Sequence, residues 1–166
     1  NKKNSKMRLL AVVPCSLYGS TGDSVNETQL LEALSSKVNC LIAFYLSRIG
    51  KAKKAKRDVP SNMILVSLPF VPYFGMISQI FYSFLVSLVA YAFDKMHKFD
   101  LIYIRGANFA VGFMLSKRLR EKTVVKIPAI VEDEILFKGL AKILVKKIAS
   151  FTDRLVLARA KKVAVS

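Results

Sequence analysis

The feature that most constrains this chain is an uncharged segment, Val59 to Phe93, in a protein that carries a formal net charge of +16. Its second part, Val71 to Phe93, is long enough to cross a bilayer, because about 20 apolar residues span the hydrocarbon core. Two prolines and a glycine interrupt the segment between residues 69 and 75, and proline both fixes φ and lacks a backbone donor. We therefore expect a buried strand, a loop and then a helix from about Met76 to Lys98, in place of one long span.

The expected helix carries a polar stripe. Polar side chains recur within it at steps of three and four residues, which places them on one face. They are Gln79, Ser83, Ser87, Tyr91 and Asp94. A helix that faces lipid has no need of such a stripe, so the pattern counts against a membrane span.

Short apolar segments alternate with helical ones along the whole chain. The expected strands are 7–14, 38–46, 63–70, 100–106, 123–128 and 161–166. A capping box from Ser24 to Glu27 opens the first expected helix, and Ala107 to Glu121 forms a later one with a basic end. Six strands that alternate with helices predict an α/β fold: a doubly wound, mostly parallel sheet of about six strands, Rossmann-like, in three layers.

The charge and the cysteines limit the function classes. Lys and Arg number 27 against 11 Asp and Glu, so the surface attracts anions such as nucleic acid, an anionic bilayer or phosphorylated substrates. Composition does not choose among the three. Cys15 and Cys40 lack CxxC spacing and the chain has one histidine, so we expect free thiols and no metal site.

In doubly wound sheets, ligands bind in the loops beyond the carboxyl ends of the strands. The loop after the first strand reads YGSTGD, and the backbone N–H groups of Gly19, Ser20, Thr21 and Gly22 could cradle a phosphate or a sugar at a helix N-terminus. The alternative is a plain tight turn.

A second set of candidates follows the fourth and fifth strands. Arg105 ends a buried strand, so we expect it either to meet a ligand or to pair with the acidic cluster Glu132, Asp133 and Glu134. The same cluster holds the candidates for a general base. An ordinary acidic first turn of a helix is the alternative.

The order of these segments resembles the N-terminal domain of a GT-B glycosyltransferase of family 4. The resemblance covers nearly the whole chain and rests on VVPCSLYGSTGDSVNETQLLEAL, DLIYIRG, KIPAIVEDE and the final VAVS. DLIYIRG is similar to the D-x-[IV]-Y-x-R form of part of the family. The chain departs from the family in having GSTG where a tandem glycine pair is common, and in lacking a histidine after the fifth strand.

The resemblance implies a glycosyltransferase of the hexosyltransferase type. Residues 1–166 would form one acceptor-side domain, while the donor site and its E-x7-E motif would belong to a C-terminal domain absent from this chain. The chain alone would then be catalytically incomplete. Gly19 to Gly22, Arg105 and Asn108 would line the cleft. A nucleotide sugar would serve as co-substrate, with no cofactor and no metal.

Members of the family that act on lipid-linked acceptors dock on membranes, and this implies a cytoplasmic, peripherally membrane-associated protein with an anionic membrane surface and a sugar acceptor as partners. Cations and apolar groups together bind such surfaces. The expected membrane contacts are Arg48, Lys51, Lys53, Lys54, Lys56, Arg57, Tyr73 and Phe74. In the alternative, the basic loop is merely solvated and the aromatic side chains belong to the core.

Two other function classes stay open. A basic α/β module could bind nucleic acid, but the basic segments lack the interleaved aromatic residues on which bases stack, so we expect no nucleic acid partner. A single-span membrane protein would use Val71 to Phe93 as its span.

Overall fold

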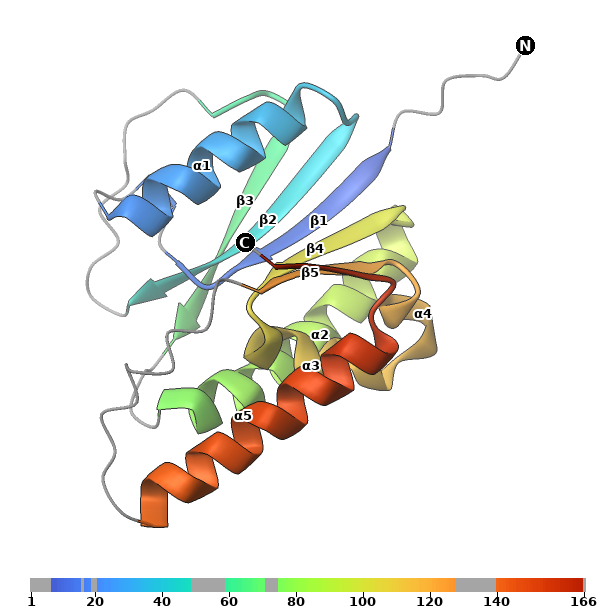
Figure 1. Ribbon diagram of the computed structural model, residues 1–166. Coiled ribbons are helices and arrows are strands. Elements are labelled where there is room, and N and C mark those ends of the chain that lie inside the picture. The colour runs from blue at the N-terminus through green and yellow to red at the C-terminus, as the bar shows by residue number, and fades with distance from the viewer. Residues whose placement is uncertain are drawn as a thin grey trace.

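The computed structural model describes residues 7–15, 17–18, 21–48, 59–70, 75–127 and 140–165. Its centre is a six-stranded sheet in the order β3-β2-β1-β4-β5-β6, in which all paired strands are parallel (Figure 1). The strands are β1 (Arg8–Val13), β2 (Cys40–Arg48), β3 (Met63–Phe70), β4 (Leu101–Arg105), β5 (Thr123–Ile127) and β6 (Lys162–Val165). The order runs outward from β1 in one direction and from β4 in the other, which confirms the doubly wound sheet.

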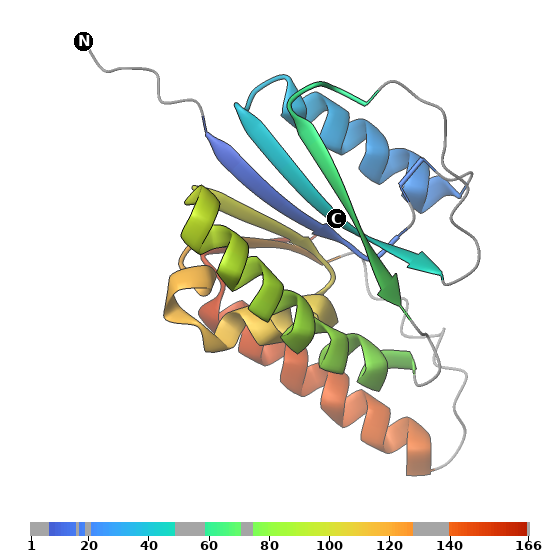
Figure 2. The same cartoon turned by 180° about the vertical axis from the view of Figure 1, so that it is seen from behind.

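The helices cover both faces of the sheet. They are α1 (Gly22–Ser35), α2 (Gly75–His97), α3 (Ala107–Leu115), α4 (Lys117–Arg120) and α5 (Leu140–Arg159). α1 lies alone on one face among the described elements, while α2 to α5 lie together on the other, with α3 between α2 and α5 (Figures 1 and 2). The predicted three layers are therefore confirmed, and we call α2 to α5 the four-helix layer.

Two apolar cores hold the layers together. In β1, Leu10 and Val12 belong to the core beneath the four-helix layer, and Leu9, Ala11 and Val13 belong to the core beneath α1. Successive side chains of a strand point to opposite faces, so a strand that is buried on both sides must be apolar throughout. This requirement explains the unbroken apolar segment LLAVV.

Two predicted helix boundaries were wrong. The first helix begins at Gly22, because Thr21 caps it and accepts a hydrogen bond from the Ser24 backbone N–H (3.3 Å); the expected cap, Ser24, lies within the first turn. The single helix expected from 107 to 121 is divided into α3 and α4, because Ser116 takes an extended backbone (φ −93°, ψ 117°) between them.

The polar stripe of α2 faces inward. Ser83, Ser87 and Asp94 are buried, and the Ser83 hydroxyl accepts a hydrogen bond from the backbone N–H of Gly112 in α3 (3.0 Å). A Cβ atom at Gly112 would lie 2.5 Å from the Ser83 carbonyl oxygen, so only glycine allows this approach of the two helices. The stripe therefore joins α2 to α3.

Asp94 anchors the C-terminal end of α2. Its carboxylate is buried and accepts hydrogen bonds from Arg118, from Lys122 (2.8 Å) and from the backbone N–H of Phe99 (3.0 Å). One helix of the described residues, Ile77–His97, is long and apolar enough to cross a membrane by length and composition. If α2 spanned a membrane, it would have to break the contact of Ser83 with Gly112 in α3. It would also have to break the ion pairs of Asp94 with Arg118 of α4 and with Lys122.

Candidate functional site

Five polar side chains meet at the carboxyl edge of the sheet, and we call them the edge cluster. They are Asp23, Glu27, Tyr103, Arg105 and Lys126. Tyr103 and Arg105 are two positions apart in β4, which points both to the same face. Lys126 lies opposite Arg105 in the register of β4 and β5. Asp23 and Glu27 are four residues apart in α1, so they face the sheet from one side of that helix.

Glu27 is the centre of the cluster. Its carboxylate is 1% exposed and lies 3.5 Å from Arg105 Nε and 3.4 Å from Lys126 Nζ. It also accepts a hydrogen bond from the Tyr103 hydroxyl at 3.0 Å. A buried carboxylate is stable only when it is paired and hydrogen-bonded, and here three donors satisfy it.

Arg105 connects this buried centre to the surface. Its side chain is 13% exposed, and its Nη2 atom lies 2.6 Å from Oδ1 of Asp23, whose side chain is 68% exposed. Burial by itself lowers the pKa of Arg105, but the pairing with Asp23 and Glu27 outweighs it and raises the pKa above its usual value. The guanidinium is therefore a permanent cation at the sheet edge, and Asp23 is its solvent-facing partner.

Tyr103 of the cluster and Cys15 beside it are held in their neutral forms. Burial, followed by the proximity of Glu27, raises the pKa of Tyr103, so its hydroxyl remains a hydrogen-bond donor. Burial also raises the pKa of Cys15 to about 11, although Arg105 opposes the effect. A thiol with such a pKa is not a nucleophile near neutral pH. The geometry suits binding and orientation by charge, and within the described ranges no group of three or more His, Cys, Asp or Glu side chains could hold a metal ion.

The predicted site residues fall in different places. Thr21 and Gly22 lie at the start of α1 beside the cluster, and the space around Gly22 is open enough to accept a Cβ atom without contact. Arg105 pairs with acidic residues of α1, which the sequence did not predict. Asn108 lies within the four-helix layer, where it donates to Gln79 of α2 (3.0 Å) and accepts from Thr152 of α5 (3.2 Å).

Several predicted residues lie outside the described residues, or their side chains do. They are Gly19 and Ser20 of the first loop, the cluster Glu132, Asp133 and Glu134, and the expected membrane contacts Lys51, Lys53, Lys54, Lys56, Arg57, Tyr73 and Phe74. Arg48 is the last residue of β2, and its side chain is also outside the description.

Sequence reasoning missed Glu27, Tyr103 and Lys126. Glu27 was assigned to a capping box, and a helix position does not reveal which side faces the sheet. A signal was nevertheless present, because Arg105 and Lys126 are charged residues inside otherwise apolar strands. Such charges require a partner when they are buried.

The comparisons with known proteins bear on the fold. No protein-family model matches the sequence, and no curated protein matches it. A solved structure of sucrose-phosphate synthase from Thermosynechococcus elongatus is similar to this chain, with a TM-score of 0.64 at 14% sequence identity. The similarity covers 94% of this chain and 41% of that one, so the chain spans about two fifths of that protein's length.

At this level of identity the similarity concerns the fold alone. The chain therefore has a Rossmann-like α/β fold, which part of sucrose-phosphate synthase shares.

Proposed function

We propose that this chain is the N-terminal, acceptor-side half of a glycosyltransferase of family 4. The reaction would move a sugar from a nucleotide-sugar donor to a lipid-linked or polymeric acceptor at the cytoplasmic face of a membrane. The observation that carries the proposal is the edge cluster, which lies on a glycosyltransferase-like fold at the edge of the sheet where doubly wound proteins bind ligands.

The arrangement of charges suits an anionic or hydroxyl-rich substrate. Glu27 is buried and fixes the guanidinium of Arg105 from within, while Asp23 is exposed and holds it from outside. A phosphate or a sugar hydroxyl can take the place of Asp23 on Arg105, because an exposed ion pair contributes little stability. Arg105 would bind the substrate and Glu27 would be a positioning residue.

The donor side of the reaction belongs to a further domain in this proposal. The 166 residues correspond to 41% of sucrose-phosphate synthase, which supports the idea that a glycosyltransferase of this type needs more chain than is present here. The nucleotide sugar would be a co-substrate bound mainly by that domain, and no cofactor would be required. The 166-residue chain alone would then transfer no sugar.

A transfer assay tests the proposal. Radiolabelled nucleotide sugars are incubated with membrane lipid extracts and with a protein that continues beyond Ser166. We expect Arg105→Ala to lower kcat/KM about 10- to 100-fold, since one charge-assisted hydrogen bond contributes about 1.5 to 3 kcal/mol. Lys37→Ala, at an exposed position just after the C-terminal end of α1, is the matched control and should retain activity.

Two results would contradict the proposal. One is the absence of transfer from every nucleotide sugar tested to both lipid and polymeric acceptors. The other is unchanged kcat/KM in the Arg105→Ala variant, which would remove the edge cluster from the substrate site.

A further inference from the structure

The outer face of α2 is apolar, which reverses the usual arrangement of a surface helix. Ile77, Phe81, Leu85, Leu88 and Met96 are exposed and lie three, four or eight residues apart, on one side of the helix. Phe81 is 66% exposed and Leu88 68%. The side of α2 that packs against α3 is its polar stripe. Only 28% of the most apolar 18-residue segment of this helix is buried.

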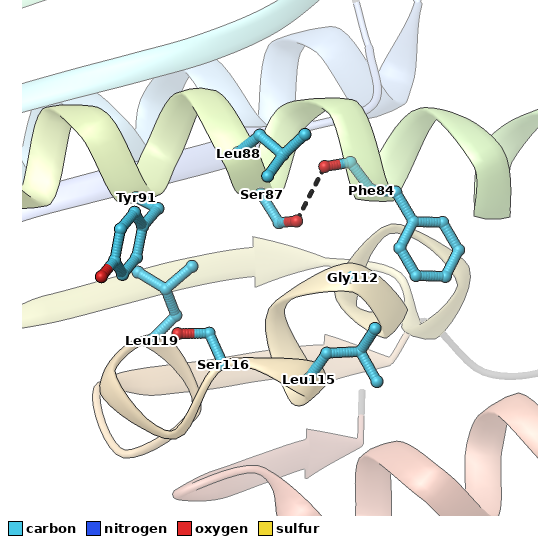
Figure 3. A pocket seen from close by; sticks show the side chains of 8 residues that line it. All are labelled: Phe84, Ser87, Leu88, Tyr91, Gly112, Leu115, Ser116 and Leu119. Carbon is cyan, nitrogen blue, oxygen red and sulfur yellow. Dashed lines mark hydrogen bonds between the residues drawn. The ribbon is translucent and has the colours of Figure 1, made fainter.

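An apolar groove runs beside this face. It lies between α2 and the α3–α4 segment and has a volume of about 470 Å³. Figure 3 shows side chains of both segments around it: Phe84, Ser87, Leu88, Tyr91, Gly112, Leu115, Ser116 and Leu119. Leu88 and Leu115 are exposed at the groove, whereas Ser87 and Leu119 are buried beneath its surface.

Exposed apolar side chains gather on the four-helix layer as a whole. Of the fifteen large apolar side chains that are exposed in the described part of the chain, eleven belong to α2, α3 or α5. On the opposite face, α1 carries one of them, Val25. Large exposed apolar patches mark interaction sites on soluble proteins, and most of the exposed apolar side chains of the described residues lie on this layer.

The same layer is strongly basic. Among the described side chains of α2 to α5, the exposed cations are Lys95, Lys117, Arg118, Lys146, Lys147, Arg154 and Arg159, and Lys98 follows α2 directly. The described carboxylates of the layer are the buried Asp94 and the half-buried Asp153, with the exposed Glu121 just after α4, whereas α1 carries three carboxylates, Asp23, Glu27 and Glu32. Lys95 lies 4.8 Å from the ring centre of Tyr91, which places a cation at the rim of the groove.

We infer that the four-helix layer docks on an anionic lipid bilayer, with the outer stripe of α2 among the acyl chains and the cations of the layer against the headgroups. Apolar side chains and Lys or Arg on one surface are the combination that binds such a bilayer. A second copy of the chain fits less well, because a symmetric interface would bring two basic layers together.

This inference adds a membrane-docking surface to the proposed function. It depends on the proposed function only in taking the sugar acceptor to be a lipid. The sequence placed the membrane contacts in Arg48 to Arg57 and at Tyr73 and Phe74. The inference adds the whole outer length of α2 and the groove beside it. Vesicle binding requires no sugar transfer, so docking and transfer can each fail independently.

The test is cosedimentation of the purified chain with vesicles of phosphatidylcholine and phosphatidylglycerol in a ratio of about seven to three, and with phosphatidylcholine alone. We expect binding to the anionic vesicles that weakens as salt is added. Phe81→Ser combined with Leu88→Ser should lower the partition coefficient about 30-fold, since each loses roughly half of the transfer free energy of a large apolar side chain. Both residues are exposed, so the fold should persist, and thermal unfolding checks this.

Matched variants on and after α1 serve as controls for the apolar contribution and for the charge contribution to vesicle binding. Val25→Ser removes an exposed apolar side chain of α1 and should change the partition coefficient less than twofold. Lys95→Gln with Lys117→Gln should lower it about 30-fold on anionic vesicles, at about 1 kcal/mol for each cation, whereas Lys37→Gln after α1 should have little effect.

Three outcomes would overturn the inference. They are equal binding to neutral and anionic vesicles, equal loss in the α2 double variant and in Val25→Ser, and a dimer in sedimentation equilibrium that dissociates in the α2 double variant without any vesicle binding. The last result would assign the face to a second copy. A folded double variant with a selective loss of anionic vesicle binding would support the inference.

Discussion

Asp94 offers the sharpest test of what holds the four-helix layer together. Its carboxylate is fully buried, and its two oxygens accept from Arg118, Lys122 and the Phe99 backbone N–H. Asp94→Ala removes all three interactions and leaves the buried Phe99 N–H without its acceptor. We expect the free energy of unfolding to fall by about 3 to 5 kcal/mol, the usual effect of breaking a buried ion pair.

An isosteric variant separates this loss of stability into the contribution of the charge and that of the Phe99 N–H group. Asp94→Asn keeps an oxygen for the Phe99 N–H and loses the charge that Arg118 and Lys122 neutralise. Because both cations are partly exposed and regain water, we expect a smaller loss of about 2 kcal/mol. The difference between the two variants then reports the orphaned N–H group, which costs about 1 to 3 kcal/mol.

The assay is urea unfolding followed by circular dichroism at several pH values. Burial by itself would raise the pKa of Asp94, but hydrogen bonds and charge from Lys122 and Arg118 outweigh it and hold the pKa below its ordinary value of 3.8. A carboxylate with a lowered folded-state pKa stabilises the protein above its unfolded-state pKa, and this contribution disappears as the pH falls through the folded-state pKa. The stability difference between wild type and Asp94→Asn should therefore be complete at neutral pH and shrink below about pH 4.

The matched control is Glu121→Gln. Glu121 lies on the surface, 4.0 Å from Lys117, and its loss should cost less than about 0.5 kcal/mol. A loss below about 1 kcal/mol for Asp94→Ala would refute the reasoning, because a buried carboxylate with three donors cannot be that dispensable. A wild-type advantage over Asp94→Asn that grows as the pH falls below about 4 would refute the assigned pKa direction.

Four further predictions concern the rest of the molecule. Gly112→Ala should destabilise the fold by about 1 to 3 kcal/mol or more, because its Cβ would meet the backbone of α2, whereas Gly22→Ala, in open space, should cost nothing; urea unfolding compares the two. Glu27→Ala should cost about 3 kcal/mol by leaving Lys126 and the buried side of Arg105 unpaired, measured in the same way. Thr21→Ala should cost about 1 kcal/mol through loss of the cap, seen as a lower Tm. Single-stranded DNA and RNA should show no gel shift at physiological salt, and a tight shift there would favour a nucleic-acid module.

The strands and the doubly wound character of the sheet were predictable because they depend on local pattern. β3 coincides with the predicted strand 63–70. Pro60 and two polar residues precede it, Pro69 is its last residue but one, and Pro72 follows it. A doubly wound sheet then follows from alternating strands and helices, because parallel strands require crossovers of one hand. These arguments use neighbours in sequence, and the structure confirms them.

The edge cluster was only partly predictable because it joins distant residues. Glu27 meets Tyr103, 76 positions away, and Lys126, 99 positions away. Their meeting depends on which side of α1 faces the sheet and on the register of β4 with β5, and neither is encoded locally. Arg105 could be identified alone, because a charge at the end of a buried strand requires a partner, but the acidic partner named from the sequence was the cluster at 132–134 and not Asp23 and Glu27 of α1.

The polar stripe of α2 shows a related limit. Its spacing predicted that Gln79, Ser83, Ser87, Tyr91 and Asp94 share a face, and periodicity is sufficient for that, although Tyr91 is exposed. Periodicity does not say whether that face is turned toward water or toward protein. The close approach at Gly112 decided the question, and one glycine in an apolar helix is too weak a signal to reveal it.

The contact between Ser83 and Gly112 also constrains how this protein can change over evolutionary time. A larger residue at 112 would push α2 away from α3, and because α2 is one rigid helix, the shift would carry Asp94 away from Arg118 and Lys122. Tolerated substitutions at these positions must therefore occur in combination. Among homologous sequences, a residue other than glycine at 112 should be accompanied by a changed partner for the buried carboxylate of Asp94. The Ser83–Gly112 contact and the ion pairs of Asp94 should therefore vary together.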